Sequence, residues 1–150
     1  MALFIARCNS DHPDFVALYQ KLDAENVTRY GPLPSFHTQL NKVEGLATVV
    51  IVYDGQEAIG CGCFRPMNDR ECELKRMFVR PSHRGTTVAT MILSELEVWA
   101  AASGFRKMLL RTGNRQPEAI RFYQRMGYSS IPPFGQYIGD PQSVCMDKSL

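Results

Sequence analysis

One stretch, residues 71–99, constrains the fold more than any other, because it reads as a strand, a tight loop and a helix. The strand covers 71–79 and ends at Arg80-Pro81, since proline cannot donate a hydrogen bond to a β-ladder. A helix over 86–103 is indicated by apolar residues at spacings of three and four, namely Val88, Met91, Ile92, Leu96 and Trp99. We expect the next strand, 107–111, to run parallel to 71–79 through a right-handed crossover.

The loop between this strand and this helix is suited to an anion. Its side chains are small, namely Gly85, Thr86, Thr87 and Ala89, and basic residues surround it, namely Arg80, His83 and Arg84. The first amides of a helix lack partners inside the helix, and the helix dipole adds partial positive charge there. The loop therefore predicts a phosphate or pyrophosphate site, with a plain structural joint as the alternative.

The remaining elements predict a single mixed α/β domain over 1–150 with one sheet. Strands are expected at 2–8, 46–53, 57–64, 128–131 and 143–147, and helices at 13–26, 36–44 and 117–126. Asp54-Gly55 is a hairpin turn, and Gly60 and Gly62 in the returning strand indicate a close approach or a bulge.

Two segments resemble the GNAT N-acetyltransferase superfamily, in particular its small single-domain bacterial-type members. In VRPSHRGTTVATMIL, Arg84 and Ala89 fit the pattern Arg-x-x-Gly-x-Gly/Ala, whereas Thr87 stands where the family usually has glycine. Downstream, the segment from Asn114 to Tyr128 is similar to the family's second motif, with Phe122-Tyr123 before a Gly-(Phe/Tyr) pair. The two motifs occur in the right order at the right separation.

The resemblance implies a GNAT-type fold, with a mixed, mostly antiparallel sheet, splayed central strands and flanking helices. It implies acetyl-CoA as the co-substrate and no metal. The residues that match the family's cofactor-binding positions are Met77, Phe78, Val79, Arg84, Gly85, Thr86, Thr87, Val88, Ala89, Asn114 and Tyr123. For Asn114, plain turn chemistry is an equal alternative.

Two side chains are candidates for proton transfer. Tyr123 occupies the position where the family commonly places an acid near the cofactor sulfur, and the alternative is a core aromatic residue with a satisfied hydroxyl. Glu73 is the candidate base, because some family members place a glutamate six residues before the position of Val79. Its alternatives are a solvated carboxylate paired with Lys75, a chain of waters, or Glu71 as the base. Strict strand alternation places Glu73, Lys75, Met77 and Val79 on one face.

The expected activity is acetyl transfer from acetyl-CoA to the primary amine of a small molecule, by direct attack in a ternary complex. The walls of the acceptor site are expected at 27–40 and 131–142, where Phe134 and Tyr137 either line the site or pack within their own loop. Lys75 favours an amine that also bears a carboxylate. The rivals are a non-catalytic acyl-CoA sensor, an enzyme that acts on a protein or peptide amine, and an unrelated phosphate-binding module.

Composition and charge exclude several other classes. The net charge of +2 is too small to argue for nucleic acid, and no apolar run approaches the ~20 residues that span a bilayer. The start lacks the charged region of a signal peptide, and five cysteines without such a signal predict reduced thiols in the cytoplasm. Cys61-x-Cys63 lacks a second pair of metal ligands, and we expect Cys145 to be a small buried residue. The sequence leaves a homodimer open.

Overall fold

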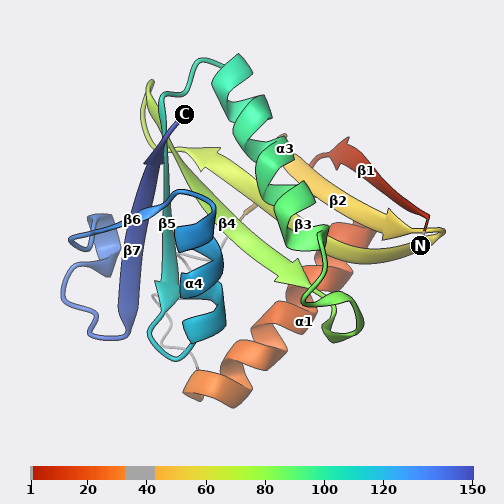
Figure 1. Ribbon diagram of the computed structural model, residues 1–150, viewed down its shortest axis with the longest axis horizontal. Helices are drawn as coiled ribbons and strands as arrows, with labels where there is room; N and C mark the ends of the chain where they lie inside the picture. Colours follow the sequence, from red (N-terminus) through yellow and green to blue (C-terminus); the bar gives the residue numbers. More distant parts are fainter. Residues whose placement is uncertain (1, 33–42) are drawn as a thin grey trace.

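The computed structural model describes residues 2–32 and 43–150, in which helices flank one sheet (Figure 1). The strands are β1 (Leu3–Cys8), β2 (Val49–Asp54), β3 (Glu57–Pro66), β4 (Glu71–Val79), β5 (Lys107–Gly113), β6 (Ser129–Ile131) and β7 (Ser143–Ser149). The helices are α1 (Pro13–Tyr30), α3 (Val88–Ala102) and α4 (Pro117–Arg125), with short 3₁₀ turns η1 (Pro81–His83) and η2 (Gly135–Tyr137). The helix expected at 36–44 lies largely outside the described residues.

The seven strands pair in the order β1-β2-β3-β4-β5-β7-β6. Five of the six pairings are antiparallel, and β4 with β5 is the parallel exception. The crossover between those two strands runs through α3, as the order strand, helix, strand requires. The expectations of a mixed, mostly antiparallel sheet and of a parallel central pair are therefore confirmed.

The helices cover both faces of the sheet. Helices α3 and α4 lie on one face (Figure 1), where Val88, Ile92 and Leu96 of α3 are fully buried against strand residues. Helix α1 lies on the opposite face, where Phe15 and Leu18 pack against β2, β3 and Phe78. The apolar stripes read from the sequence are thus the two surfaces that bury the sheet.

The two central strands separate after a short run of pairing. Strands β4 and β5 pair only from Glu71–Lys107 to Leu74–Leu110, although β4 continues to Val79 and β5 to Gly113. Figure 1 shows them diverging into a V whose open end lies near the start of α3 and of α4. The splayed central strands that the resemblance implied are confirmed.

A bulge in β4 overturns the strict alternation expected along that strand. Cys61 pairs with Phe78 and Cys63 with Lys75, so two β4 residues oppose the single residue Gly62. One of the two, Arg76, has a φ of 60°, which is left-handed and uncommon for a residue other than glycine. The extra residue reverses which face the following side chains occupy. Met77 and Val79 pack on the α3 side, opposite to Glu73 and Lys75 rather than beside them.

The glycines of β3 make room for these contacts. A methyl group added at Gly62 would lie 2.6 Å from the sulfur of Met77, and one at Gly60 would lie 2.9 Å from Cδ1 of Ile92. The sequence left a close approach and a bulge as alternatives at these glycines, and the structure has both.

Two element starts differ from the prediction because local hydrogen bonds compete with regular structure. Strand β2 begins at Val49, since Leu46 exchanges hydrogen bonds with Ser10 instead of entering the ladder. Helix α3 begins at Val88, since the hydroxyl of Thr86 donates to the carbonyl of His83 and closes a turn.

Candidate functional site

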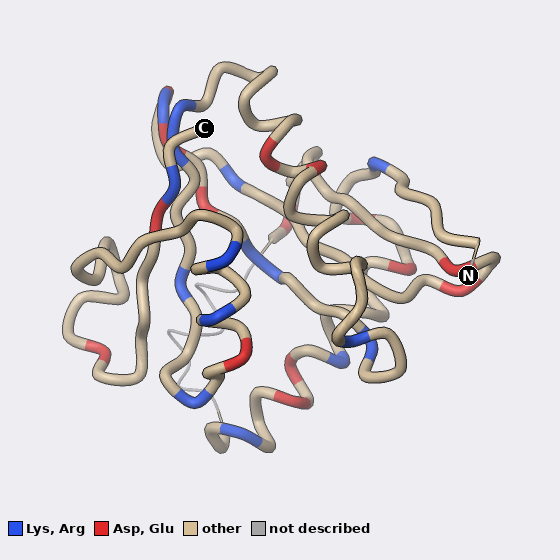
Figure 2. The backbone as a smooth tube through the Cα atoms, in the orientation of Figure 1, with Lys and Arg blue, Asp and Glu red and all other residues tan. Residues whose placement is uncertain are grey.

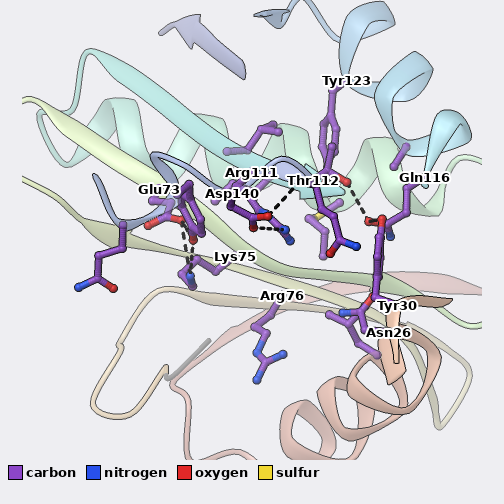
Figure 3. A pocket seen from close by; sticks show the side chains of 18 of the residues that line it. Asn26, Tyr30, Glu73, Lys75, Arg76, Arg111, Thr112, Gln116, Tyr123 and Asp140 are labelled. Atoms are coloured by element: carbon purple, nitrogen blue, oxygen red, sulfur yellow. Dashed lines mark hydrogen bonds and ion pairs between the residues drawn. The ribbon is translucent and has the colours of Figure 1, made fainter. Parts of the chain in front are cut away.

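A cavity of about 500 Å³ occupies the gap between β4 and β5. Its walls come from β4, β5, the end of α1, the start of α4 and the loop 136–142. Figure 3 shows Glu73, Lys75, Arg111 and Asp140 toward one side of it and Tyr30, Gln116 and Tyr123 toward the other. The described parts of both predicted acceptor walls, 27–32 and 131–142, contribute lining residues. The rest of the first wall lies outside the described residues.

Glu73 is buried and hydrogen-bonded on both carboxylate oxygens. Oε2 accepts from the Tyr137 hydroxyl at 2.6 Å and from Nζ of Lys75 at 3.5 Å. Oε1 accepts from the Arg65 guanidinium at 3.2 Å. The side chain of Glu73 is only 3% exposed, so the solvated carboxylate considered from the sequence is wrong, whereas its pairing with Lys75 is present.

Lys75 and Tyr137 complete this buried cluster. Nζ of Lys75 donates to the Tyr137 hydroxyl at 3.3 Å, and burial lowers the pKa of Lys75, against the charge of Glu73. Burial raises the pKa of Tyr137, and its hydrogen bond to the Glu73 carboxylate adds to the rise. Tyr137 therefore stays a neutral phenol that donates to Glu73.

A second ion pair stiffens the same wall. The Arg111 guanidinium donates to Asp140 at 3.2 Å and, through Nε, to Ser143 at 2.8 Å. Arg111 also lies over the ring of Tyr137, 5.7 Å from its centroid, and Phe134 packs edge-on to that ring. Tyr137 thus packs within its own loop and also lines the cavity, so both of the alternatives considered from the sequence hold for this residue.

Helix α1 is tied to the turn before α4, across the open end of the gap (Figure 1). The Tyr30 hydroxyl accepts from the backbone amide of Arg115 at 3.1 Å, and it donates to Gln116 at 3.5 Å. Gln116 Oε1 also accepts from the Thr112 hydroxyl and from the Gly113 amide, both at 3.1 Å. Sequence reasoning did not single out Tyr30 or Gln116, because their contacts join residues 86 positions apart.

Tyr123 projects from α4 toward the cavity and is 8% exposed. Its ring packs edge-on against Tyr128, and burial raises the pKa of its hydroxyl. Among residues 2–32 and 43–150, no hydrogen-bond partner is found for that hydroxyl. Tyr123 is therefore a core aromatic residue whose polar end remains available to a ligand.

The anion loop lies beside the end of β4. Gly85 has a φ of 74°, a left-handed conformation that suits glycine and turns the loop toward the start of α3. Thr87 is the N-cap residue of α3 but makes no capping hydrogen bond with its side chain. Arg84 does not extend freely, since Nε donates to the Val79 carbonyl and its terminal nitrogen to both Glu25 oxygens, all within 2.8 Å.

The side chains of the other residues matched to cofactor positions lie in three places: the cavity, the two hydrophobic cores and the surface. Met77 lines the cavity, whereas the side chains of Phe78 and Val88 belong to the two cores. Asn114 is exposed and does not line the cavity. Its backbone amide donates to the Gln142 carbonyl at 2.8 Å, and its side-chain amide donates to the Pro141 carbonyl at 3.5 Å. These contacts join the turn after β5 to the loop before β7.

Positive charge flanks the open end of the gap. Figure 2 shows Lys and Arg residues on the loop before α3 and along α4, on either side of the opening. These residues are Arg80, Arg84, Arg115, Arg121 and Arg125. An anionic ligand at the mouth would meet guanidinium groups from both sides, of which Arg84 and Arg80 are already paired with Glu25 and Glu57.

The cysteines, the potential metal ligands and the helices add three observations. All five cysteines are free, and Cys145 is 2% exposed beside Tyr137, as expected of a small buried residue. Within the described part of the chain, no three His, Cys, Asp or Glu side chains gather as metal ligands would. None of the helices there is both long and apolar enough to cross a bilayer.

Comparison with known proteins adds a family to this geometry. The model of the acetyltransferase (GNAT) family matches residues 11–128. The IAA acetyltransferase of Azospirillum brasilense is 38% identical over 93 residues, which are 61% of this chain and 61% of that relative. The match thus spans about three fifths of the length of that curated relative.

Solved structures share the whole fold. A putative acyl-CoA N-acyltransferase from Klebsiella pneumoniae superposes with a TM-score of 0.80 at 31% identity, covering 99% of this chain and 97% of that one. A GNAT family acetyltransferase from Elizabethkingia anophelis, solved with acetyl-CoA bound, superposes with a TM-score of 0.73 at 16% identity, covering 99% of both chains.

Proposed function

Because the chain belongs to the GNAT acetyltransferase family, we propose that it transfers an acetyl group from acetyl-CoA to the primary amine of a small molecule, by direct attack in a ternary complex. The observation that carries the proposal is the cavity between the diverging strands β4 and β5. The cavity is lined by a buried carboxylate, Glu73, and by Tyr123, whose hydroxyl has no hydrogen-bond partner among the described residues.

The residues present fit an acyl-CoA. The loop 85–89 offers small side chains and the amides at the start of α3 to a pyrophosphate, although the Val88 amide already donates to the Thr86 hydroxyl at 3.4 Å. Among the described residues, no strand pairs with the edge of β4 that faces β5 beyond Leu74, so this edge is open to the pantetheine arm near Met77 and Phe78. The Val79 carbonyl already accepts from Arg84. When bound, acetyl-CoA supplies the activated acetyl group as a thioester.

The chain supplies the two proton transfers and the alignment. Glu73 is the base that takes the proton of the acceptor nitrogen, and Tyr123 is the acid that protonates the leaving thiolate. The raised pKa of Tyr123 keeps its proton in place at neutral pH until a thiolate forms beside it. A backbone amide near Met77 polarises the thioester carbonyl.

The cavity also favours a small acceptor over a protein tail. The cationic lining residues have carboxylate partners, and one further cation lies beside Glu73. Lys75, Arg76 and Arg111 pair with Glu73, Asp23 and Asp140, and Arg65 also pairs with Glu73, which leaves an excess of one positive charge. A carboxylate on the acceptor would offset the excess of positive charge, whereas a polyamine or a lysine-rich tail would add to it. An amine that also carries a carboxylate is therefore the preferred class of acceptor.

The test combines binding with turnover. Acetyl-CoA at ~100 times its dissociation constant should stabilise the fold by about 2.7 kcal/mol and raise the melting temperature. Amino acids, polyamines, aminoglycosides and lysine peptides are then assayed with acetyl-CoA by thiol detection of free CoA. Turnover of peptides alone would contradict the small acceptor. A thermal shift without turnover of any amine would favour the acyl-CoA sensor, and no shift at millimolar CoA would overturn the proposal.

A further inference from the structure

Glu73 is poorly placed to meet an acceptor directly. Its side chain is only 3% exposed, and both carboxylate oxygens already accept hydrogen bonds from side chains that surround it. Arg65 covers Oε1, and Tyr137 and Lys75 cover Oε2. Because so little of the Glu73 side chain is exposed, an acceptor nitrogen would reach its carboxylate only if one of the covering side chains moved.

Tyr137 offers a route that displaces none of them. Its hydroxyl donates its single proton to Oε2 of Glu73 at 2.6 Å, a short and strong hydrogen bond to a charged acceptor. A phenol oxygen has further acceptor capacity, of which Nζ of Lys75 takes one position at 3.3 Å. Within residues 2–32 and 43–150 no other group donates to the Tyr137 oxygen, so one acceptor position remains on a residue that lines the cavity.

The ring of Tyr137 is held in this orientation. Phe134 packs edge-on to it, with the ring centroids 5.3 Å apart, and the Arg111 guanidinium lies over its face. Arg111 is anchored in turn by Asp140 and Ser143. Contacts on the ring and at the hydroxyl fix the phenol oxygen beside Glu73 in the wall of the cavity.

We propose that Tyr137 relays the proton of the acceptor nitrogen to Glu73. The nitrogen gives its proton to the Tyr137 oxygen while the Tyr137 hydroxyl proton passes to Oε2 of Glu73. The freed lone pair of the nitrogen forms the bond to the acetyl carbon, and the carbon–sulfur bond breaks with Tyr123 protonating the sulfur. The nitrogen then gives its second proton to Tyr123, which restores the Tyr123 phenol and leaves the neutral amide, and Glu73 releases its proton to solvent. Tyr137 is a neutral phenol before and after the step. This inference rests on the proposed function, and it replaces a direct contact between Glu73 and the acceptor.

The neighbouring charges suit such a relay. Lys75 donates to the phenol oxygen and Arg111 lies over the ring, so two cations stabilise negative charge that develops on Tyr137 during the transfer. Burial and the Glu73 carboxylate raise the pKa of Tyr137, which prevents it from resting as a phenolate. These neighbours thus favour a transient transfer of a proton through Tyr137, which is a neutral phenol at rest.

The test compares Tyr137→Phe with Tyr53→Phe. Tyr53 donates to the Asp14 carboxylate at the same 2.6 Å but does not line the cavity, so it controls for the loss of a tyrosine–carboxylate hydrogen bond. With the amine found in the acceptor screen, we expect kcat/KM to fall by about 10²-fold or more in Tyr137→Phe. In Tyr53→Phe it should stay near the wild-type value. The KM for acetyl-CoA should not change in either variant.

Amine basicity separates a relay from a structural role. A strongly basic amine reaches the cavity with a proton to lose, whereas a weakly basic fluorinated analogue arrives neutral. The loss in Tyr137→Phe should therefore be several-fold smaller for the analogue. Because Tyr137 and Glu73 act one after the other in the relay, their losses of kcat/KM should not multiply. The double variant Tyr137→Phe with Glu73→Gln should be no slower than the slower of the two single variants.

Three results would overturn the relay. They are an unchanged kcat/KM in Tyr137→Phe, an equal loss for both amines, or multiplicative losses in the double variant. If none of the amines tested makes the wild-type protein release CoA, the proposed function fails and the relay fails with it. That result is distinct from wild-type turnover that is insensitive to Tyr137.

Discussion

Adding a single methyl group at Gly113 should release helix α1 from the far half of the sheet. A Cβ atom built at Gly113 would overlap the hydroxyl end of Tyr30, which must then move. Moving it removes the hydrogen bond from the Arg115 amide, about 0.5–1.5 kcal/mol, and the contact of the Arg115 guanidinium with the Tyr30 ring, about 0.5–1 kcal/mol. Replacing a strand glycine by alanine returns about 0.5–1 kcal/mol. The net destabilisation should be about 1 kcal/mol.

A double-mutant cycle in urea tests this reasoning. In a Tyr30→Ala background nothing remains for the new methyl group to displace, so Gly113→Ala should stabilise the protein by about 0.5 kcal/mol. Tyr30→Phe should relieve only part of the overlap, because the ring carbons stay. The slope of the unfolding free energy against urea should not change. An equal cost of Gly113→Ala in both backgrounds would refute the role of Tyr30.

Three further predictions concern the site. Thr87→Gly should leave CoA affinity unchanged or tighter by calorimetry, because the Thr87 side chain makes no capping hydrogen bond and stands where the family usually has glycine; a tenfold loss would mean that its hydroxyl binds phosphate. Tyr123→Phe should lower kcat by about 10²–10⁴-fold with CoA affinity kept, provided that chemistry limits turnover, and an unchanged single-turnover rate would assign Tyr123 to the core alone. The pKa of Lys75 is lowered from 10.5 by burial, so the unfolded chain binds more protons, and raising the pH toward 10.5 should stabilise the wild type relative to Lys75→Met in urea titrations; parallel pH dependences would contradict this.

The regular elements could be predicted from the sequence because their signals are local. The parallel pair β4–β5 followed from a strand, a helix with one apolar stripe and another strand. Strand β4 begins and ends where Glu71 and Pro81 indicated. Such features depend on neighbours within a few residues, which periodicity and proline report directly.

The face that each β4 side chain occupies could not be predicted, because the bulge leaves no mark in the residues of β4 themselves. Arg76 carries the left-handed φ although arginine has no preference for it. The signal lay in the opposing strand, where Gly62 leaves space for Met77. A glycine opposite a charged residue within a buried strand pair is the pattern that points to such a bulge.

The buried cluster at Glu73 was only partly predictable. Lys75 is two residues away, so its pairing with Glu73 could be considered from the sequence. Tyr137 is 64 residues away, on a loop that proline and glycine interrupt, and no local rule joins the two. Arg111 gave a weaker signal, as a cation inside an otherwise apolar strand, which usually means a buried partner.

The short pairing of β4 with β5 has a consequence for how the molecule meets its ligands. At one end of the gap, the ladder up to Leu74–Leu110 fixes the two half-sheets, and at the other end Tyr30 spans to the turn at Arg115. The width of the gap is thus set by two joints of the protein and not by what lies between them. A ligand that enters finds its walls preorganised and spends little binding energy on closing them. The same rigidity sets an upper limit on the width of an acyl group that fits the gap. Shortening the side chain at position 30 should widen the gap and raise that limit.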